Sequence, residues 1–553
     1  MPSRVSLPTK KPVVLEKQKP TPPLDPMLPP VPVLSDYGVS PTNGFLPDVL
    51  PLSRLPDPYY NKWEAIATNL QALILSKRLR AVVDRLPVLS TVGLEHESEW
   101  RRAYSILCFM AHGYIWGGDS PADRLPVPLA VPLLQIAEHL ELPPVATYAA
   151  VCLWNFKPLF VDEPIDSLDN LATLTTFTGS LDESWFYLVS VAIEARGAPA
   201  IPIMLEAIAA ARRRDVGAVT RCLRAFAECL DEVGTLLARM HDSCDPTIFY
   251  HRIRPFLAGS KNMADAGLPR GVIYEDGSGA EEYRQYSGGS NAQSSIIQFF
   301  DIVLGVSHRP TGDKASPPSP SPDDPAQQPR GRQPAAPAAA ARQHNFIQEM
   351  RRYMPGPHAR FLADVGAVAN IREFVELRAA AGDRALGLAY DACLSMLSAM
   401  RDRHIAIVTR YIVVPSREVR ARSRSRSPEA ARRVVVNLAT ASRAAAGPAA
   451  AATATTGATA GPGKGGALKG TGGTALIAFL KQARDETGEP AVEQWTRRFM
   501  KRAARSDGKG AGDFFLGKQD DDFCVGAETE QVQVKGLAGL WTMEDEVGGI
   551  CNY

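Results

Sequence analysis

The common signatures of protein metal sites are missing from this sequence of 553 residues. Its eight cysteines include no CxxC pair, and its nine histidines form no HExxH motif and no Cys–His spacing that suits zinc. Isolated cysteines are typical of a reducing compartment and argue against a secreted scaffold stapled by disulfides. If the protein holds a metal, these absences favour haem over zinc.

Long apolar runs and a large net charge are missing as well. No stretch approaches eighteen uninterrupted apolar residues, and the first residues lack the apolar core of a signal peptide. The formal net charge is only +1, which gives no general attraction to nucleic acid or to a membrane surface. We therefore expect an intracellular, cytoplasmic protein without a nucleic-acid or membrane partner.

Proline and small residues divide the chain into ordered and disordered parts. Residues 1–35 hold ten prolines and are predicted to form a disordered arm. The internal segments 309–341 and 416–468 are rich in Pro, Ala, Gly, Arg and Ser, and they have too few large apolar residues to bury a core. We expect both to be disordered insertions. The polar tail at 506–553 carries no pattern that can be assigned.

Helical periodicity dominates the rest of the sequence. Apolar residues recur at helical spacing in runs such as 63–86 and 99–116, with proline-containing turns between them. A further helix begins with a capping box at 180–183, in which Ser and Glu each satisfy a free amide. The pattern predicts an all-α protein with a smaller helical domain at 36–177 and a larger one at 178–505.

His404 is the strongest candidate for a metal ligand. It lies in a run over 394–412 whose apolar residues recur at helical spacing. Four of them share its face of the predicted helix, namely Leu397, Met400, Val408 and Tyr411. A buried neutral imidazole offers one nitrogen lone pair to haem iron. The alternative is a core histidine whose ring is bonded to a backbone carbonyl.

Arg401 and Asp301 are each a charged residue in apolar surroundings. Arg401 lies one turn before His404, near the same apolar face. Asp301 is the only ionisable residue in the apolar run over 295–305. Because a buried charge without a partner is costly, we expect the two residues to form an ion pair behind the His404 helix. A haem propionate is a possible further partner of Arg401.

Several other motifs allow more than one interpretation. Arg254 follows Tyr250 by one helical turn, so it suits a planar carboxylate ligand as well as a snorkelling position at the surface. The turn KGTGGT at 469–474 lacks the spacing of a nucleotide-binding loop, but its amides and hydroxyls could hold a carboxylate. The small residues at 288–295 suit an ordinary tight turn or a close approach of backbone. Alternating Arg and Ser at 422–428 indicate a solvated basic loop, or a segment that attracts RNA.

The sequence resembles the indoleamine 2,3-dioxygenase family in stretches that occur in the family's order. These stretches are GYIWGG from Gly113, LELPPVATYA from Leu140, FYLVSVAIEA from Phe186, HDSCDPTIFYHRIRPFLAG from His241, GGSNAQSSIIQFFDIVLG from Gly288, IQEMRRYMPGPHARFL from Ile347, YDACLSML from Tyr390, RDRHIAIVTRYI from Arg401 and GTGGTALIAFLK from Gly470. MRRYMP and GTGGT are highly specific, so chance is a poor explanation.

The resemblance implies an all-α, two-domain haem protein that opens the pyrrole ring of L-tryptophan with O₂. The product would be N-formylkynurenine, in the first step of tryptophan breakdown through kynurenine towards NAD. One haem b per chain, with His404 as its axial ligand, and a monomeric state are further expectations. Ferrous haem binds and activates O₂, so most of the protein's work is to orient the indole beside it.

The resemblance also implies roles for individual residues. The distal pocket would be lined by Tyr114, Phe186, Ser190 and Phe249. The substrate carboxylate would be held by Arg254, Thr471 and Gly472. The haem would be surrounded by Ser290, Asn291, Ala292, Asp301 and Arg401, with His404 as the proximal ligand. Ser190 and Arg254 are the two residues expected to serve catalysis.

The sequence departs from the family pattern at the edge of this pocket. Ala258 stands where many relatives have serine, Asn291 and Ala292 replace a smaller pair, and Pro255 adjoins Arg254. These differences leave open a second hypothesis, a haem-sensing or interaction protein that does not turn over substrate. The Arg/Ser segment leaves a third, an RNA-associated protein, against which the near-neutral net charge speaks.

Overall fold

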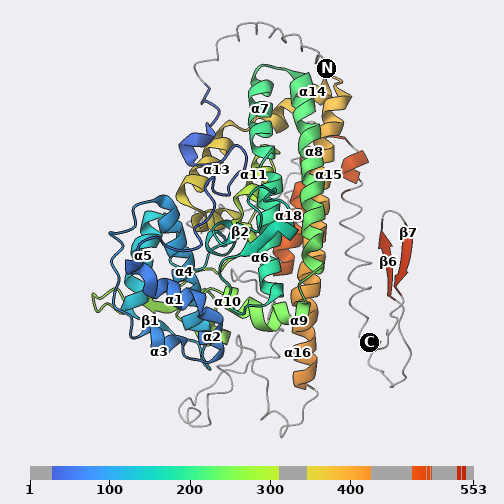
Figure 1. Ribbon diagram of the computed structural model, residues 1–553. Coiled ribbons are helices and arrows are strands. Elements are labelled where there is room, and N and C mark those ends of the chain that lie inside the picture. The colour runs from blue at the N-terminus through green and yellow to red at the C-terminus, as the bar shows by residue number, and fades with distance from the viewer. Residues whose placement is uncertain are drawn as a thin grey trace, which may run out of the picture. The chain divides into compact units, whose positions relative to one another are not determined.

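The computed structural model describes residues 28–310, 346–424, 476–493, 495–498, 500, 532–536 and 539–543. Helices dominate these residues and the strands are short, so the prediction of an all-α fold is confirmed (Figure 1). Met1–Lys501 belongs to one compact unit and Arg502–Tyr553 to a second. The division between a smaller domain at 36–177 and a larger one at 178–505 stays a prediction.

The first unit holds the helices. The α-helices are α1 (Asn61–Thr68), α2 (Leu70–Leu75), α3 (Leu79–Val83), α4 (Glu97–Trp116), α5 (Val127–His139), α6 (Leu181–Gly197), α7 (Ala200–Arg212), α8 (Val216–Ala238), α9 (Pro246–Ile248), α10 (Arg254–Leu257), α11 (Ser295–Val303), α12 (Phe346–Met350), α13 (Gly356–Val368), α14 (Ile371–Ala380), α15 (Arg384–Val408), α16 (Val414–Arg424) and α18 (Leu476–Thr487). Three π-helical turns are η3 (Ala149–Leu153), η6 (Phe249–Ile253) and η10 (Thr409–Val413). Two 3₁₀ turns near the site are η8 (Asn291–Gln293) and η9 (Arg351–Tyr353).

Short strands tie loops together between the helices. β1 (Arg124–Leu125) pairs in parallel with β4 (Val272–Tyr274), which pairs antiparallel with β5 (Tyr283–Arg284). β2 (Phe156–Pro158) pairs antiparallel with β3 (Leu171–Thr173). In the second unit, β6 (Val532–Gly536) and β7 (Gly539–Met543) form an antiparallel hairpin, in a tail where the sequence predicted nothing.

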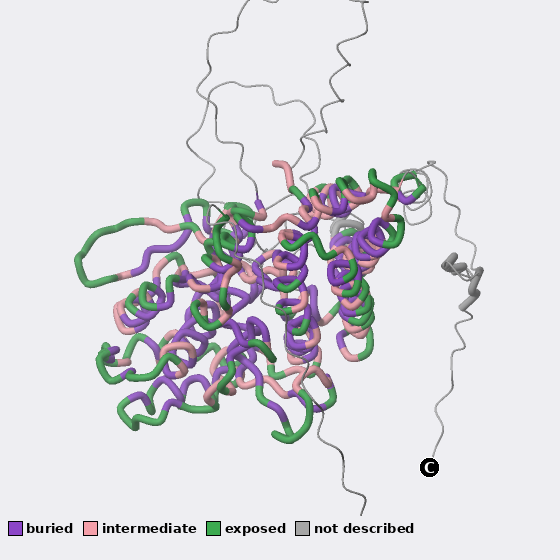
Figure 2. The backbone as a smooth tube through the Cα atoms, turned by 90° about the horizontal axis from the view of Figure 1, so that it is seen from above, coloured by how far each residue is buried: buried purple, intermediate pink, exposed green. Residues whose placement is uncertain are grey.

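The longest helices, α8 and α15, run side by side and carry much of the core (Figure 1). α8 buries a stripe at helical spacing, made of Val219, Leu223, Phe226, Leu230 and Val233. α15 contributes Leu386, Tyr390, Cys393 and Leu397 to the same core, and these side chains are also fully buried. Each such side chain contributes about 1.5–3 kcal/mol by leaving water. Figure 2 shows the buried residues running through the centre and the exposed ones on the outer loops.

Some predicted helices have different bounds in the structure. The run 99–116 is helical as predicted, within α4, and 394–412 lies within α15 and η10. The run 63–86 is not one helix but three short ones. Lys77, with φ at 57°, interrupts the helical backbone between α2 and α3. The capping box is half right, because the side chain of Ser180 accepts from the Glu183 amide at 3.3 Å. The Glu183 carboxylate instead accepts from amides that precede Ser180.

The predicted disordered segments coincide only partly with the described residues. The insertion predicted at 416–468 is wrong at its beginning, because α16 continues to Arg424. Pro415 falls in the first turn of α16, where a missing amide donor is tolerated, and no glycine follows before Arg424. The predicted arm at 1–35 is wrong at its end, where Leu34–Tyr37 forms a 3₁₀ turn. Residues 1–27, 425–468 and most of 309–341 lie outside the described residues.

One stretch of the described residues, Leu181–Arg212, is long and apolar enough to cross a membrane by those two criteria. It comprises α6 and α7, which Ala198 and Pro199 separate. In its most apolar window, 78% of the residues are buried inside the protein. The stretch is weak evidence for a membrane span, because the core accounts for its apolar character.

Candidate functional site

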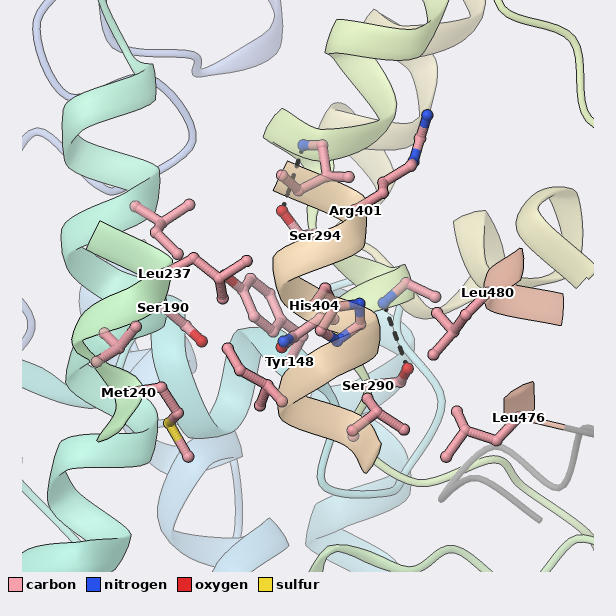
Figure 3. Close-up of a pocket in the computed structure, with 18 of the residues that line it drawn as sticks. Tyr148, Ser190, Leu237, Met240, Ser290, Ser294, Arg401, His404, Leu476 and Leu480 are labelled. Atoms are coloured by element: carbon pink, nitrogen blue, oxygen red, sulfur yellow. Dashed lines mark hydrogen bonds between the residues drawn. The ribbon is translucent and has the colours of Figure 1, made fainter. Parts of the chain in front are cut away.

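A cavity of about 250 Å³ opens between α6, α11, α15 and α18, and Figure 3 shows side chains pointing into it from several of these helices. Most of the side chains on its walls are aliphatic or aromatic. The structure brings together at this cavity most of the residues predicted from the sequence, namely Phe186, Ser190, Phe249, Arg254, Ser290, Asn291, Ala292, Asp301, Arg401 and His404. Residues far apart in the chain therefore meet in one place.

His404 projects into the cavity from near the C-terminal end of α15 (Figure 3). Burial, together with the positive charge of Arg401, lowers its pKa to about 4, so the ring is neutral near pH 7. It keeps some accessible surface because it faces the cavity, whereas Asp402 and Ala406 on the opposite side of the helix face solvent. No described residue forms a hydrogen bond with either ring nitrogen, so the alternative of a carbonyl-bonded core histidine is not supported.

The predicted pair between Asp301 and Arg401 is present beside this histidine. Arg401 Nη2 donates to Asp301 Oδ1 at 2.6 Å and to Oδ2 at 2.7 Å, so one nitrogen spans both carboxylate oxygens. Burial alone would raise the pKa of Asp301, but the charges of Arg401 and His308 outweigh it and hold the pKa below its usual range. Both side chains are nearly removed from solvent. The pair is a charged support next to the candidate metal ligand.

Sequence reasoning missed three further members of this support. His308 donates from Nε2 to Asp301 Oδ2 at 3.1 Å and from Nδ1 to Glu486 Oε2 at 2.8 Å. Thr487 Oγ1 contacts Arg401 Nη1. No local sequence pattern predicts these contacts, because Glu486 and His308 are 178 residues apart in sequence. Only the rule that buried charges need partners could have prompted a search for them.

The wall opposite this charged support is largely apolar. Phe186 and Phe249 lie with ring centroids 4.9 Å apart, and Ser190 follows Phe186 by one turn of α6. Tyr148 and Cys152 from the η3 region also line this wall, although sequence reasoning did not select them. Burial raises the pKa of both the Tyr148 hydroxyl and the Cys152 thiol, so both stay protonated. Among the lining residues that the structure describes, His404 is the only histidine.

A turn of small residues brings the backbone of 288–294 to the cavity. A Cβ on Gly288 would lie 2.0 Å from the carbonyl oxygen of Leu257, so no larger residue fits there. Ser290 then caps η8 by accepting from the Ala292 amide at 3.3 Å, and Ser294 caps α11 in the same way (Figure 3). The tight-turn interpretation and the close-approach interpretation are therefore both correct.

Arg254 is placed at the cavity wall rather than at the outer surface. Its guanidinium carbon lies 5.6 Å from the centroid of the Tyr250 ring, and burial lowers its pKa. The predicted break at Pro255 is reflected in the backbone, where the π-helical turn η6 precedes the short helix α10. The snorkelling alternative is contradicted, and Arg254 adds a cation to the lining of the cavity.

Of the remaining predicted residues, Tyr114 is not among those that line the cavity, and two fall outside the described part of the chain. Tyr114 is half-buried at the end of α4, where its hydroxyl donates to Asp84 at 2.8 Å and its ring faces Arg80. This end of α4 packs against α3, which turns Tyr114 away from the pocket it was predicted to line. Thr471 and Gly472 lie outside the described residues. The carboxylate-binding role of the GTGGT turn therefore stays a prediction.

Sequence comparisons identify relatives of the chain. A family model described as indoleamine 2,3-dioxygenase matches residues 33–490. An indoleamine 2,3-dioxygenase from Saccharomyces cerevisiae is 42% identical over 468 residues, which cover 83% of this chain and 93% of that protein. One from Penicillium citrinum is 38% identical over 468 residues, covering 83% and 89%. A 6-hydroxytryptophan 2,3-dioxygenase from Fusarium equiseti is 34% identical over 457 residues, covering 82% and 97%.

Proposed function

Because the chain belongs to the indoleamine 2,3-dioxygenase family, and is thereby a haem-dependent dioxygenase, we propose that its substrate is L-tryptophan. Under this proposal both atoms of O₂ enter the product as the indole C2–C3 bond breaks, which gives N-formyl-L-kynurenine. One relative is named for 6-hydroxytryptophan, so ring-substituted tryptophans are the competing substrates. The proposal includes one haem b per chain, with His404 as its axial ligand.

The observation that carries the haem assignment is the state of His404. A histidine must be neutral to donate a nitrogen lone pair to iron, and the lowered pKa of about 4 meets that condition. The ring faces a cavity with apolar walls, which suits the flat apolar body of a porphyrin. Arg401, bonded to Asp301 beside it, provides a positive charge near the site. The residues present therefore fit the group.

The opposite wall suits an indole with an attached amino acid. The rings of Phe186 and Phe249 offer apolar faces for an aromatic bicycle. Arg254 places a guanidinium on the same cavity, where a substrate carboxylate would form charge-assisted hydrogen bonds. Asn291 and Ala292 add side-chain volume at the turn beside it. Together these residues favour a zwitterionic indole amino acid over an indole without a carboxylate.

The chain's own contribution to the reaction is orientation and the exclusion of water. Haem, when bound, supplies the activation of O₂. Ser190, Phe186 and Phe249 present no charged base to the substrate, and Tyr148 remains a protonated phenol. Holding the indole in a fixed pose in a dry cavity converts an encounter into a unimolecular step. Arg254 fixes the end of the substrate that does not react.

Turnover of L-tryptophan by haem-loaded, reduced protein in air tests the proposal. Absorbance of N-formylkynurenine should rise with time on L-tryptophan, and the corresponding hydroxylated formylkynurenine should form more slowly from 6-hydroxytryptophan. Product only from 6-hydroxytryptophan would reassign the substrate. A Soret band without product from either compound would support the haem-sensing alternative.

The cellular location and the oligomeric state belong to the same proposal. The isolated cysteines, typical of a reducing compartment, support a cytoplasmic location, and the near-neutral net charge gives no general attraction to a membrane surface. Cell fractionation and light scattering of the purified chain test a cytoplasmic monomer. Recovery in a membrane fraction, or the mass of a dimer, would contradict it.

A further inference from the structure

His308 lies between two carboxylates that come from different helices. Its ring nitrogens are 3.1 Å from Asp301 Oδ2 and 2.8 Å from Glu486 Oε2. The side chains of His308, Asp301 and Glu486 expose only 7%, 6% and 2% of their surface, so water does not screen the contacts. We call these three residues the His308 latch. It joins α11, which carries Asp301, to α18, which carries Glu486.

The latch is the centre of a wider set of contacts that hold α18. Glu486 also accepts from the Arg309 amide at 3.1 Å and from Gln482 Nε2 at 2.9 Å. Thr487 contacts the guanidinium of Arg401, which is itself paired with Asp301. The charge at the end of α18 is therefore joined to α15, the helix of the proposed iron ligand.

The helix held in this way forms one wall of the cavity. Leu476, Leu480 and Ala483 recur at helical spacing on α18, and all three line the cavity. Figure 3 labels Leu476 and Leu480. The latch lies at the C-terminal end of the same helix. A loss of the latch would free this end of α18, while the apolar contacts of Leu476 and Leu480 would be left to hold the wall alone.

Both carboxylates of the latch can accept a hydrogen bond from His308 only if its ring is an imidazolium. Asp301 from α11 and Glu486 from α18 are negative, while Arg401 from α15, the adjacent Arg309 and Arg351 from η9 are positive. Burial would lower the pKa of His308, but the charge of Asp301 and hydrogen bonds to both carboxylates raise it to about 9. Both nitrogens then donate. A neutral ring has only one N–H and leaves one buried carboxylate without its donor.

We propose that His308 is a positioning residue that holds α18 against the Asp301–Arg401 pair and so keeps one wall of the haem cavity closed. The inference rests on the proposed function in one respect, that a closed wall serves to retain haem. The folded-state pKa lies above the ordinary value of 6.5, so the stabilising effect is fully present below pH 6.5 and is lost as pH rises through about 9. Opening of α18 should follow the same pH dependence.

Hydrogen exchange of the full-length chain without added haem tests the latch directly. At pH 7, amides of α18 in His308→Gln should exchange roughly tenfold faster than in the unchanged protein. The ratio of the two rates, taken at matched pH, should fall towards one above pH 9. Glu486→Gln should repeat the effect from the other side of the latch. Amides of α4 should not change, which separates local opening from general unfolding.

A histidine–carboxylate pair on the surface provides the matched control. His139 Nε2 lies 3.2 Å from Glu97 Oε2, and both side chains are about half exposed. His139→Gln should leave exchange in α18 unchanged. Equal exchange of α18 in His308→Gln and the unchanged protein at pH 7, or equal acceleration in α4, would overturn the inference.

Release of haem to an excess of apomyoglobin tests the consequence for the cofactor. At pH 7, His308→Gln should release haem roughly tenfold faster than the unchanged protein. The difference should shrink above pH 9, where the unchanged protein also loses its imidazolium. Equal release rates at pH 7 would overturn the link between the latch and haem retention. If no variant bound haem, the proposed function would fail, while the exchange result would still decide the latch.

Discussion

The two walls of the cavity are built on opposite electrostatic plans. The wall behind His404 is a chain of alternating charges removed from water, formed by Asp301, Arg401, His308 and Glu486. Across the cavity, Phe186, Phe249 and Ser190 provide a wall without a charged group. We refer to these as the charged wall and the apolar wall. The difference indicates that the charged wall fixes a position, whereas the apolar wall accommodates a ring without competing for it.

Such a division of labour has a physical reason. Buried ion pairs contribute little net stability, but removing one partner leaves an uncompensated charge, so they tolerate very little displacement. Aromatic contacts are non-directional by comparison and accept small changes of pose. A metal ligand needs the first kind of support, and an aromatic substrate needs the second.

Among the variants that test this comparison, Asp301→Ala in the charged wall should have the largest effect. It leaves Arg401 and His308 buried beside each other without their shared counter-charge, which should cost about 3–5 kcal/mol of folding stability. Urea denaturation of the chain without haem measures this loss. Asp301→Asn keeps the shape of the side chain and loses its charge. Its folding stability should lie between those of Asp301→Ala and the unchanged protein. A loss below about 1 kcal/mol, the range of exposed pairs, would show that the charged wall is not rigidly coupled.

Arg254→Ala tests the single cation that faces the apolar wall. Removal of a charge-assisted contact with the substrate carboxylate should lower kcat/KM roughly 30-fold or more, mostly through KM. Steady-state kinetics with L-tryptophan measures the effect, and tryptamine, which has no carboxylate, should show almost none. Arg252→Ala is the matched control, because Arg252 is exposed two residues away. Equal losses in both variants would contradict a carboxylate-binding role.

Glu194→Gln sharpens the comparison at a buried titratable group on α6, the helix that carries Phe186 and Ser190. Ser294 donates to Glu194 Oε1 at 2.6 Å, and Oε2 has no hydrogen-bond partner among the described residues. Burial raises the pKa of Glu194 from 4.5 to about 7, so folding stability falls as pH rises from about 4.5 to 7. The variant lacks this penalty and should gain roughly 1–3 kcal/mol relative to the unchanged protein between pH 4 and pH 8. Thermal unfolding across that pH range measures it, and parallel curves would contradict the assignment.

Ser190→Ala should have the smallest effect. The side chain lies on the apolar wall one turn from Phe186, so the variant removes one hydroxyl and no charge. We expect kcat to fall less than about tenfold, which is smaller than the loss of a general base. Stopped-flow or steady-state turnover measures it. A loss of 100-fold or more would give Ser190 a direct part in proton transfer and would end the description of this wall as passive.

The charged wall was only partly predictable from the sequence. Asp301 and Arg401 could be paired because Asp301 is a lone charge in an apolar run and Arg401 lies near the apolar face of its helix. A buried charge in either place is costly without a partner. Glu486 and His308 gave no such signal, since each stands among other polar residues and their contact spans 178 positions. Periodicity reports which face of a helix is buried but not which helix it meets.

The apolar wall shows the same limit in another form. Phe186, Ser190 and Phe249 were assigned through resemblance, and the structure places them at the cavity. Tyr114 was assigned in the same way, but it bonds Asp84 on the far side of the α3–α4 contact. The run 63–86 was taken as one helix because its apolar spacing is continuous, whereas the turn at Lys77 depends on packing against α4. Local pattern fixes the type of element better than its length or its neighbours.

Haem ligation by His404 is the central claim, and the Soret spectrum of His404→Gly tests it most directly. The unchanged protein, titrated with haem, should give the spectrum of a histidine-ligated haem at a stoichiometry of one per chain. The variant should lose that spectrum and regain it when free imidazole is added, because the small ligand fills the space left by the side chain. A histidine-type spectrum in His404→Gly without imidazole would contradict the account and place the iron on another residue.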